Sequence, residues 1–285
     1  MDSSNEYPLL EKIEIHLLLE GIYRQYGYDF RNYSFPSIRR RIWHRMHAER
    51  LTTVTGLLDL VLHKREAMDR LFEDFSINVT EMFRDPLFFL MLRRKVLPEL
   101  RHLPAIRIWH AGCSTGEEVY SMNILLHEEN LYAKTRLYAT DMNEMVLERA
   151  RRGIFPLEKM QLYTKNYLQS GGRREFSEYY SVKQGNVLFT PLLSDNVVFS
   201  EHNLATDHSF NEFHMIICRN VLIYFNEKLQ RRVLGLFDES LNPEGFLGLG
   251  NKEGIPSLVW TGRYQEVDAK EKIFRKVPAS RRIMD

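Results

Sequence analysis

Apolar residues recur at helical spacing along the first quarter of the chain. Between residues 11 and 75 four stretches show it, the first containing Ile15, Leu18 and Ile22. Because residues three and four apart share one face of a helix, this spacing predicts amphipathic helices. The second should begin after Ser34, since Pro36 is well tolerated in a first helical turn. Together the stretches predict a small all-helical domain over residues 1–75.

After residue 105 the pattern becomes that of buried strands. A strand beginning at Ile106 runs into a turn with Gly112 and Gly116 and then into a helix, and glycine lets the backbone turn tightly and approach a ligand. A second strand, from Leu137, ends on Asp141, where a Rossmann-like unit would bind ribose hydroxyls. The glycines lack dinucleotide spacing and no basic phosphate anchor follows, so S-adenosylmethionine fits better than a dinucleotide. A turn that binds no ligand is the alternative.

Three short runs between residues 160 and 200 are rich in aromatic and β-branched residues and are separated by glycines, as at Gly171 and Gly185. They predict a small antiparallel β subdomain at about 165–200, inserted in an α/β fold. One of these runs spans residues 196–199. The other expected elements are helices at 143–152 and 227–241, a loop at 242–245, strands at 215–218 and 246–249, and a last strand near 272–277.

A segment of mixed character joins the helical region to the first strand. Residues 76–85 place Asn78, Thr80 and Arg84 among apolar neighbours, and Pro86 then marks a helix that should continue through Leu97. Linkers are usually uniformly polar, so this composition favours a segment that lies across a ligand site. The expected domains are a helical domain at 1–75, a connector at 76–85 that contributes to the site, and a catalytic domain at 86–285.

Composition restricts the classes of function. The chain has 285 residues, 44% of them hydrophobic, and a net charge of +1, so a whole-protein attraction to nucleic acid or to membranes is not expected. Cys113 and Cys218 lack metal-ligand spacing and predict free thiols, and the ten histidines give no metal site. An acidic start and the lack of a long apolar run predict a cytoplasmic protein without membrane insertion.

Basic residues gather on the polar side of the second expected helix. Arg39, Arg40, Arg41 and Arg45 lie within seven positions of one another. So many arginines on one short helix suggest a docking surface for an acidic partner. An ordinary solvated face is the alternative.

Five motifs stand in order along the chain. They are Asn78-Val-Thr-Glu-Met-Phe-Arg84, Gly112-Cys-Ser-Thr-Gly-Glu-Glu118, Ala139-Thr-Asp141, His202-Asn-Leu204 and Ile217-Cys-Arg-Asn-Val-Leu-Ile-Tyr-Phe225. This set closely resembles the bacterial chemoreceptor glutamate methyltransferase family, called CheR. The resemblance implies a Rossmann-like sheet that transfers a methyl group from S-adenosylmethionine to glutamates on the cytoplasmic helical bundle of a chemoreceptor, leaving S-adenosylhomocysteine and a glutamyl methyl ester.

The resemblance also implies roles for single residues. Arg84 and Tyr224 would lie nearest the transferred methyl group, and Asp141 would hold the ribose hydroxyls. We also expect the arginines of the second helix to dock the receptor, because their charge would complement a methylation region rich in glutamate. The full set of implied cofactor contacts is Asn78, Thr80, Arg84, Gly112, Glu118, Asp141, Asn203, Leu204, Arg219 and Asn220.

Methyl transfer to a carboxylate needs no general base, because the nucleophile is already ionised at neutral pH. Arg84 could orient the incoming glutamate, and Tyr224 could fix either the carboxylate or the sulfonium, with a purely structural role as its alternative. An adaptor that only binds S-adenosylmethionine, or a methyltransferase of the same fold with another substrate, is the alternative function. The family commonly shows Gly-His-Ser-Glu where this chain has Gly250-Asn-Lys-Glu253. We expect a monomer.

Overall fold

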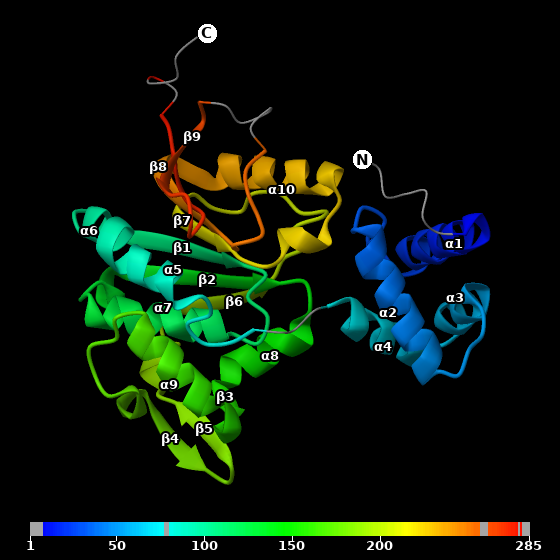
Figure 1. Cartoon of the computed structure of the whole chain (residues 1–285), viewed down its shortest axis with the longest axis horizontal. Helices are drawn as coiled ribbons and strands as arrows, with labels where there is room; N and C mark the ends of the chain where they lie inside the picture. The colour runs from blue at the N-terminus through cyan, green and yellow to red at the C-terminus, as the bar shows by residue number, and fades with distance from the viewer. Residues whose placement is uncertain (1–7, 77–79, 257–261, 279, 281–285) are drawn as a thin grey trace. The chain divides into compact units, whose positions relative to one another are not determined.

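Two compact units make up the protein. In the computed structural model, residues 8–76, 80–256, 262–278 and 280 are described. One unit comprises Met1–Ile77 with Ile223–Arg232, and the other comprises Asn78–Leu222 with Val233–Asp285. Figure 1 follows the chain by colour from one end to the other.

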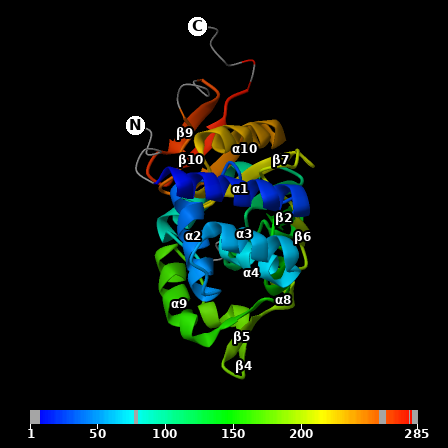
Figure 2. The same cartoon turned by 90° about the vertical axis from the view of Figure 1, so that its right-hand side faces the viewer.

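The first unit is built from helices, as the periodicity predicts. Each helix buries the face that carries its apolar spacing, so that Ile15, Leu18 and Ile22 of the first helix are fully buried. The third helix is capped by Thr53, whose side chain accepts a hydrogen bond from the Gly56 amide at 3.1 Å. The helices, all visible in Figure 2, are α1 (Leu9–Tyr26), α2 (Phe35–Ala48), α3 (Val54–His63) and α4 (Arg65–Phe75).

A short segment from far along the chain completes this unit. The Ser34 amide donates to the carbonyl of Tyr224 at 2.7 Å, and the Asn226 amide donates to the carbonyl of Asn32 at 2.9 Å. Between these bonds, Tyr33 and Phe225 form an antiparallel bridge, and their rings meet edge to face with centroids 5.0 Å apart. The loop between α1 and α2 is therefore paired on both sides of this bridge.

The second unit contains a seven-stranded sheet in the order β6-β2-β1-β7-β8-β10-β9. Figure 1 labels its strands except β10. The first five strands of that order are parallel, and the last two pair antiparallel. The strands are β1 (Ile106–Ala111), β2 (Thr135–Asp141), β6 (Val197–Glu201), β7 (Phe213–Cys218), β8 (Leu241–Leu249), β9 (Tyr264–Asp268) and β10 (Ile273–Lys276). The prediction of a Rossmann-like sheet is confirmed.

Both faces of the sheet are covered. Neighbouring residues of a strand point to opposite faces, so Ile108 and Trp109 belong to different layers of the core. The Trp109 ring packs against Phe213 and against Phe237 of α10, whereas Ile108 joins the large cluster that includes Phe88. The helices of this unit are α5 (Pro86–Met91), α6 (Leu97–Leu100), α7 (Glu117–Glu128), α8 (Glu144–Arg152), α9 (Met160–Gln169) and the part of α10 (Glu227–Ser240) that begins at Val233.

A small antiparallel sheet projects from the second unit in both views (Figures 1 and 2). Its order is β3-β5-β4, formed by Ile154–Pro156, Asn186–Phe189 and Tyr180–Lys183. The expected insertion is thus present. Residues 196–199, however, were wrongly expected in it, because β6 pairs with β2 in the main sheet. The Asn196 side chain fixes this pairing by donating to the Thr135 carbonyl at 3.1 Å.

Two further details depart from the expected elements. The helix that begins at Pro86 is interrupted by a π-helical turn at Leu92–Val96, before it resumes as α6. The loop expected at 242–245 lies within β8 as an irregularity, since Leu241 pairs with Phe213, Phe246 pairs with Met215, and the register shifts between these two pairs. Left-handed backbone at Glu244, with φ of 65°, accompanies this irregularity and lets a Pro-containing stretch remain in the strand.

Candidate functional site

The turn after β1 is shaped by its glycines. Gly112 has φ of 77°, and a Cβ there would lie 2.6 Å from a methyl of Val221. Gly116 has φ of 92°, and its Cβ would lie 2.8 Å from that of Ala150. The amides of Gly112 and Cys113 both donate to the Thr140 carbonyl, which ties the turn to the end of β2. Only glycine fits these two positions, so the turn presents bare backbone beside Asp141.

Asp141 ends β2 with its carboxylate held in place. One oxygen accepts the Ser114 amide at 2.9 Å and the other accepts the Asn143 amide at 3.1 Å. Burial raises the pKa of Asp141, and these amides oppose the shift. Each carboxylate oxygen can accept more than one hydrogen bond, so acceptor positions remain for the two hydroxyls of a ribose. The geometry fits the role that the sequence suggests for Asp141.

A partly buried ion cluster forms around Arg219, which directly follows β7. Arg219 donates to Glu118 at 2.7 Å and to Asp85 at 2.5 Å, and its side chain is only 1% exposed. Its guanidinium carbon also lies 4.3 Å from the ring centre of Phe88. Burial raises the pKa of Glu118, but Arg219 and His110 outweigh it and lower that pKa to about 2. Glu118 is therefore an anion held by Arg219, and Asp85 adds a second carboxylate to the cluster.

Arg219 itself is less suited to bind cofactor than the sequence suggests. Both of its terminal nitrogens already meet carboxylates, and the ring of Phe88 covers its plane. Asp85 takes part in the cluster although no sequence argument singles it out. An ion pair between residues 134 positions apart leaves no local signal in a single sequence.

The connector is fastened to the second unit. The Phe83 amide donates to the Ser121 hydroxyl at 2.9 Å, and the Asn166 side chain donates to the Met82 carbonyl at 3.1 Å. Met82 and Phe83 are fully buried, whereas Thr80 and Arg84 are half-buried. The implied contact Asn78 lies outside the described residues.

The remaining implied contacts follow β6 and β7. Asn203 caps its own turn, since its side chain accepts the Ala205 amide at 2.9 Å, and Leu204 is 7% exposed. Asn220 is left-handed, with φ of 61°. Its amide donates to Glu253 at 3.0 Å, and the same carboxylate oxygen accepts the Gly250 amide at 2.6 Å.

Glu253 thus holds the backbone of Asn220 and Gly250 in place, a role that the sequence alone does not indicate. In the departing stretch Gly250-Asn-Lys-Glu253, the two residues that meet at the end of β7 are the glycine and the glutamate. A Cβ at Gly250 would lie 2.8 Å from the Asn220 nitrogen. Asn251 and Lys252, the two positions that differ from the family's Gly-His-Ser-Glu, take no part in these hydrogen bonds.

Tyr224 lies in the first unit rather than the second. Its ring faces Arg41, with the guanidinium carbon 5.5 Å from the ring centre. Arg41 in turn donates to the Asp74 carbonyl, and burial lowers its pKa. Arg41 is therefore a half-buried cation held against an aromatic ring, which differs from a solvated docking residue.

The other arginines of α2 differ in how much charge they present. Arg39 pairs with Glu11 at 2.8 Å, and Arg45 pairs with Asp74 at 2.6 Å with a side chain that is 11% exposed. Arg40 is exposed. A surface that attracts an acidic partner consequently depends most on Arg40.

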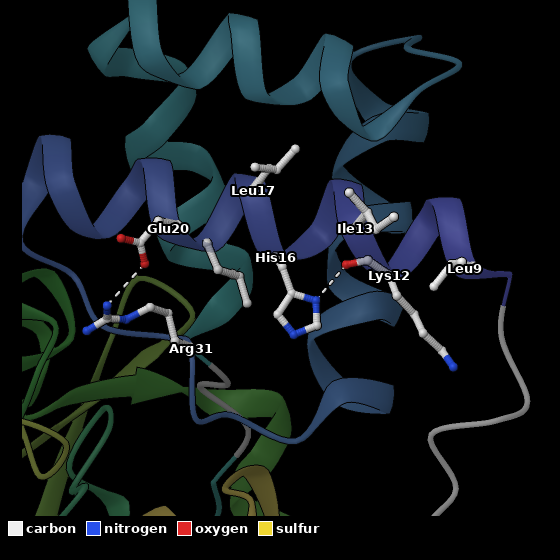
Figure 3. A pocket seen from close by; sticks show the side chains of 8 residues that line it. Leu9, Lys12, Ile13, His16, Leu17, Glu20 and Arg31 are labelled. Carbon is white, nitrogen blue, oxygen red and sulfur yellow. Dashed lines mark hydrogen bonds and ion pairs between the residues drawn. The ribbon is translucent and has the colours of Figure 1, made fainter.

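A pocket of about 580 Å³ lies elsewhere in the first unit, against α1 (Figure 3). Leu9, Ile13 and Leu17 line it, and His16 and Arg31 point toward it. None of the residues implied in cofactor binding lines this pocket.

The two cysteines are not suited to nucleophilic catalysis. Cys113 and Cys218 are buried free thiols, and burial raises their pKa values well above the usual range, so neither is a thiolate nucleophile. Within the described ranges, no group of three or more His, Cys, Asp or Glu side chains is placed to hold a metal ion. In the same ranges, each helix is too short or too polar to cross a membrane.

Comparison with known families decides the relationship. Residues 78–273 match the domain described as CheR methyltransferase, SAM binding domain, and residues 13–76 match CheR methyltransferase, all-alpha domain. The chain belongs to the CheR methyltransferase family. The resemblance drawn from the five motifs is confirmed, and this CheR protein is an S-adenosylmethionine-dependent methyltransferase.

Three relatives match this chain over most of their own length. "Putative methyltransferase Cher3" of Pseudomonas putida is 50% identical over 93% of this chain and 97% of its own. Two proteins named chemotaxis protein methyltransferase are more distant. That of Borreliella burgdorferi is 29% identical over 86% of this chain and 89% of its own, and the one numbered 1 in Vibrio cholerae is 32% identical over 71% and 73%.

Proposed function

We propose that this CheR protein methylates glutamate side chains on the cytoplasmic helical bundle of a chemoreceptor. The observation that carries the proposal is the combination of both CheR domains in one chain with relatives named chemotaxis protein methyltransferase. Asp141 at the end of β2 and Glu118 in the first turn of α7 support it from the structure, because these partly buried carboxylates suit a ribose and a cationic ligand. The product would be a glutamyl methyl ester and S-adenosylhomocysteine.

Positioning would supply most of the catalysis. Bound S-adenosylmethionine offers a methyl group on a sulfonium, which a glutamate carboxylate can attack in line without a general base. Asp141 would hold the ribose, Glu118 would stabilise positive charge, and the glycine turn would exclude water from one side. Arg84 would orient the substrate carboxylate through a charge-assisted hydrogen bond. Tyr224 is the other residue to which we assign a catalytic role, through its hydroxyl.

The test is transfer of a tritiated methyl group to a purified receptor cytoplasmic fragment. Base treatment should release the label as methanol, because only an ester of a carboxylate is cleaved in this way. A fragment with alanine at its glutamates serves as the control and should stay unlabelled. Cofactor binding without any labelled receptor would favour the adaptor, and label that resists base would indicate another substrate group.

Tyr224→Phe should lower kcat about tenfold with little effect on stability. The phenylalanine ring can keep its place against Arg41, and the backbone bond from Ser34 does not involve the side chain. The loss would therefore report the hydroxyl alone. Turnover and thermal unfolding of the variant check this, with Tyr23→Phe on α1 as a control. Full turnover with a labelled receptor would leave Tyr224 a structural residue.

Arg40→Glu should raise KM for the receptor about three- to tenfold at low salt and flatten its salt dependence. Arg40 is exposed on α2, and steering by exposed charge acts on encounter and is screened by ions. Affinity for S-adenosylhomocysteine should not change. Arg24→Glu, at a 78% exposed side chain on α1, is the matched charge reversal. Equal effects of the two variants would mean that net charge, and not α2, guides the receptor.

A further inference from the structure

Asp85 occupies the position that caps α5 but does not cap it. Aspartate is favoured before a first helical turn because its side chain accepts amide hydrogens there. Asp85 makes no such bond, and its carboxylate turns to Arg219 at 2.5 Å. The Asp85 side chain therefore links the start of α5 to Arg219 at the end of β7, and it does not cap the helix.

The backbone on both sides of Arg84 has dihedral angles that are unfavourable for residues other than glycine. Phe83 has φ of 49° and Asp85 has φ of 54°, so left-handed residues stand on both sides of Arg84. Such conformations are costly for residues with a Cβ and persist only where surrounding contacts hold them. On the N-terminal side the contact is the bond from the Phe83 amide to Ser121. On the C-terminal side it is the pair between Asp85 and Arg219.

Arg219 is built to be a rigid anchor for that pair. Its second terminal nitrogen is bound to Glu118 at 2.7 Å, and Phe88 covers its guanidinium plane. Since the Arg219 side chain is 1% exposed, the guanidinium has little freedom to follow a moving loop. The position of Arg219 therefore determines where the Asp85 carboxylate lies.

We propose that Asp85 is a positioning residue, which aims Arg84 at the substrate carboxylate by tethering the connector to the Arg219–Glu118 pair. This rests on the proposed function, in which Arg84 orients the glutamate. Releasing the tether would let the backbone at residues 83–85 relax toward ordinary φ values and swing Arg84 away. Misplacement of an orienting group by about 1 Å can cost about 100-fold in rate.

Three substitutions separate the charge of Asp85 from its backbone. Asp85→Asn keeps a residue that tolerates left-handed φ but removes the ionic bond. Asp85→Gly tolerates that φ and has no side chain to tether. Asp85→Ala loses both the tether and the tolerance. Glu244→Ala is the matched control, since Glu244 is another left-handed carboxylate residue of the second unit, with φ of 65°.

We expect kcat for the receptor to fall about tenfold in Asp85→Asn and about 100-fold in Asp85→Ala, with Asp85→Gly between them. KM for the receptor should change less than about threefold, because docking does not involve Asp85. Glu244→Ala should lower thermal stability without lowering kcat. Full turnover in Asp85→Asn and Asp85→Ala would overturn the proposal, and so would losses of kcat that merely follow stability in all four variants.

A second measurement does not depend on the receptor. Asp85→Ala should weaken S-adenosylhomocysteine binding about threefold when Arg84 is present and leave it unchanged in an Arg84→Ala background, because residues that act through one another are not additive. Equal losses in both backgrounds would overturn the tether. If wild-type protein labels no receptor, the proposed function fails, while this binding cycle still decides the role of Asp85.

Discussion

Asp141→Ala should weaken S-adenosylhomocysteine binding by about 1.5 to 3 kcal/mol, or roughly 10- to 150-fold in Kd. The substitution removes the carboxylate that the Ser114 and Asn143 amides hold in position, and with it the acceptors for both ribose hydroxyls. Isothermal titration calorimetry measures the loss directly. Because burial raises the pKa of Asp141, wild-type affinity should also begin to fall at a less acidic pH than an exposed aspartate would allow.

Asp195→Ala is a suitable control for this experiment, because Asp195 is exposed just before β6. Its Kd should equal that of the wild type. Circular dichroism must show that the Asp141 variant is folded. An unchanged Kd in folded Asp141→Ala would mean that the ribose binds at another strand end.

Arg219→Met should destabilise the second unit by about 3 to 5 kcal/mol at neutral pH. Removing the guanidinium leaves the Glu118 carboxylate buried beside Asp85 without its main partner. An uncompensated buried charge costs more than the ion pair contributes. Urea denaturation followed by circular dichroism measures the change in the free energy of unfolding.

The pH dependence of that loss has a definite sign. The pKa of Glu118 is lowered to about 2 from an ordinary value of 4.5, so its stabilising contribution is complete above pH 4.5 and disappears as the pH falls toward 2. The difference between wild type and Arg219→Met should therefore shrink on acidification through this window. Arg275→Met, which breaks the more exposed pair with Glu99, should cost less than about 1 kcal/mol. A similarly small loss at Arg219 would argue against a structural ion cluster.

Periodicity alone was enough to predict most of the elements. The helices α1 to α4 and the strands β1, β2 and β7 follow from apolar spacing, because each buries one face or both in the core of its own unit. Membership of a sheet was harder to predict. The run at 196–199 is as short and β-branched as the strands of the small sheet, and only its pairing with β2 assigns it to the main one.

The site was partly predictable for a similar reason. Gly112 and Asp141 carry local signals, since a glycine turn and a carboxylate at a strand end are short-range features. Asp85 and Glu253 carry none, because each acts through a partner remote in sequence, Arg219 in one case and Asn220 in the other. Left-handed backbone at Phe83 could not be predicted either, since phenylalanine rarely adopts it.

The pairing of residues 224–226 with the loop after α1 has a consequence for biosynthesis. The amide of Ser34 and the carbonyl of Asn32 leave the ribosome early, but their partners, the carbonyl of Tyr224 and the amide of Asn226, emerge much later. At about 5 to 20 residues per second, the gap is roughly 10 to 40 seconds. During that interval the Ser34 amide and the Asn32 carbonyl lack these hydrogen-bond partners. A fragment ending at residue 76 would never form these two hydrogen bonds, because it lacks residues 224 and 226.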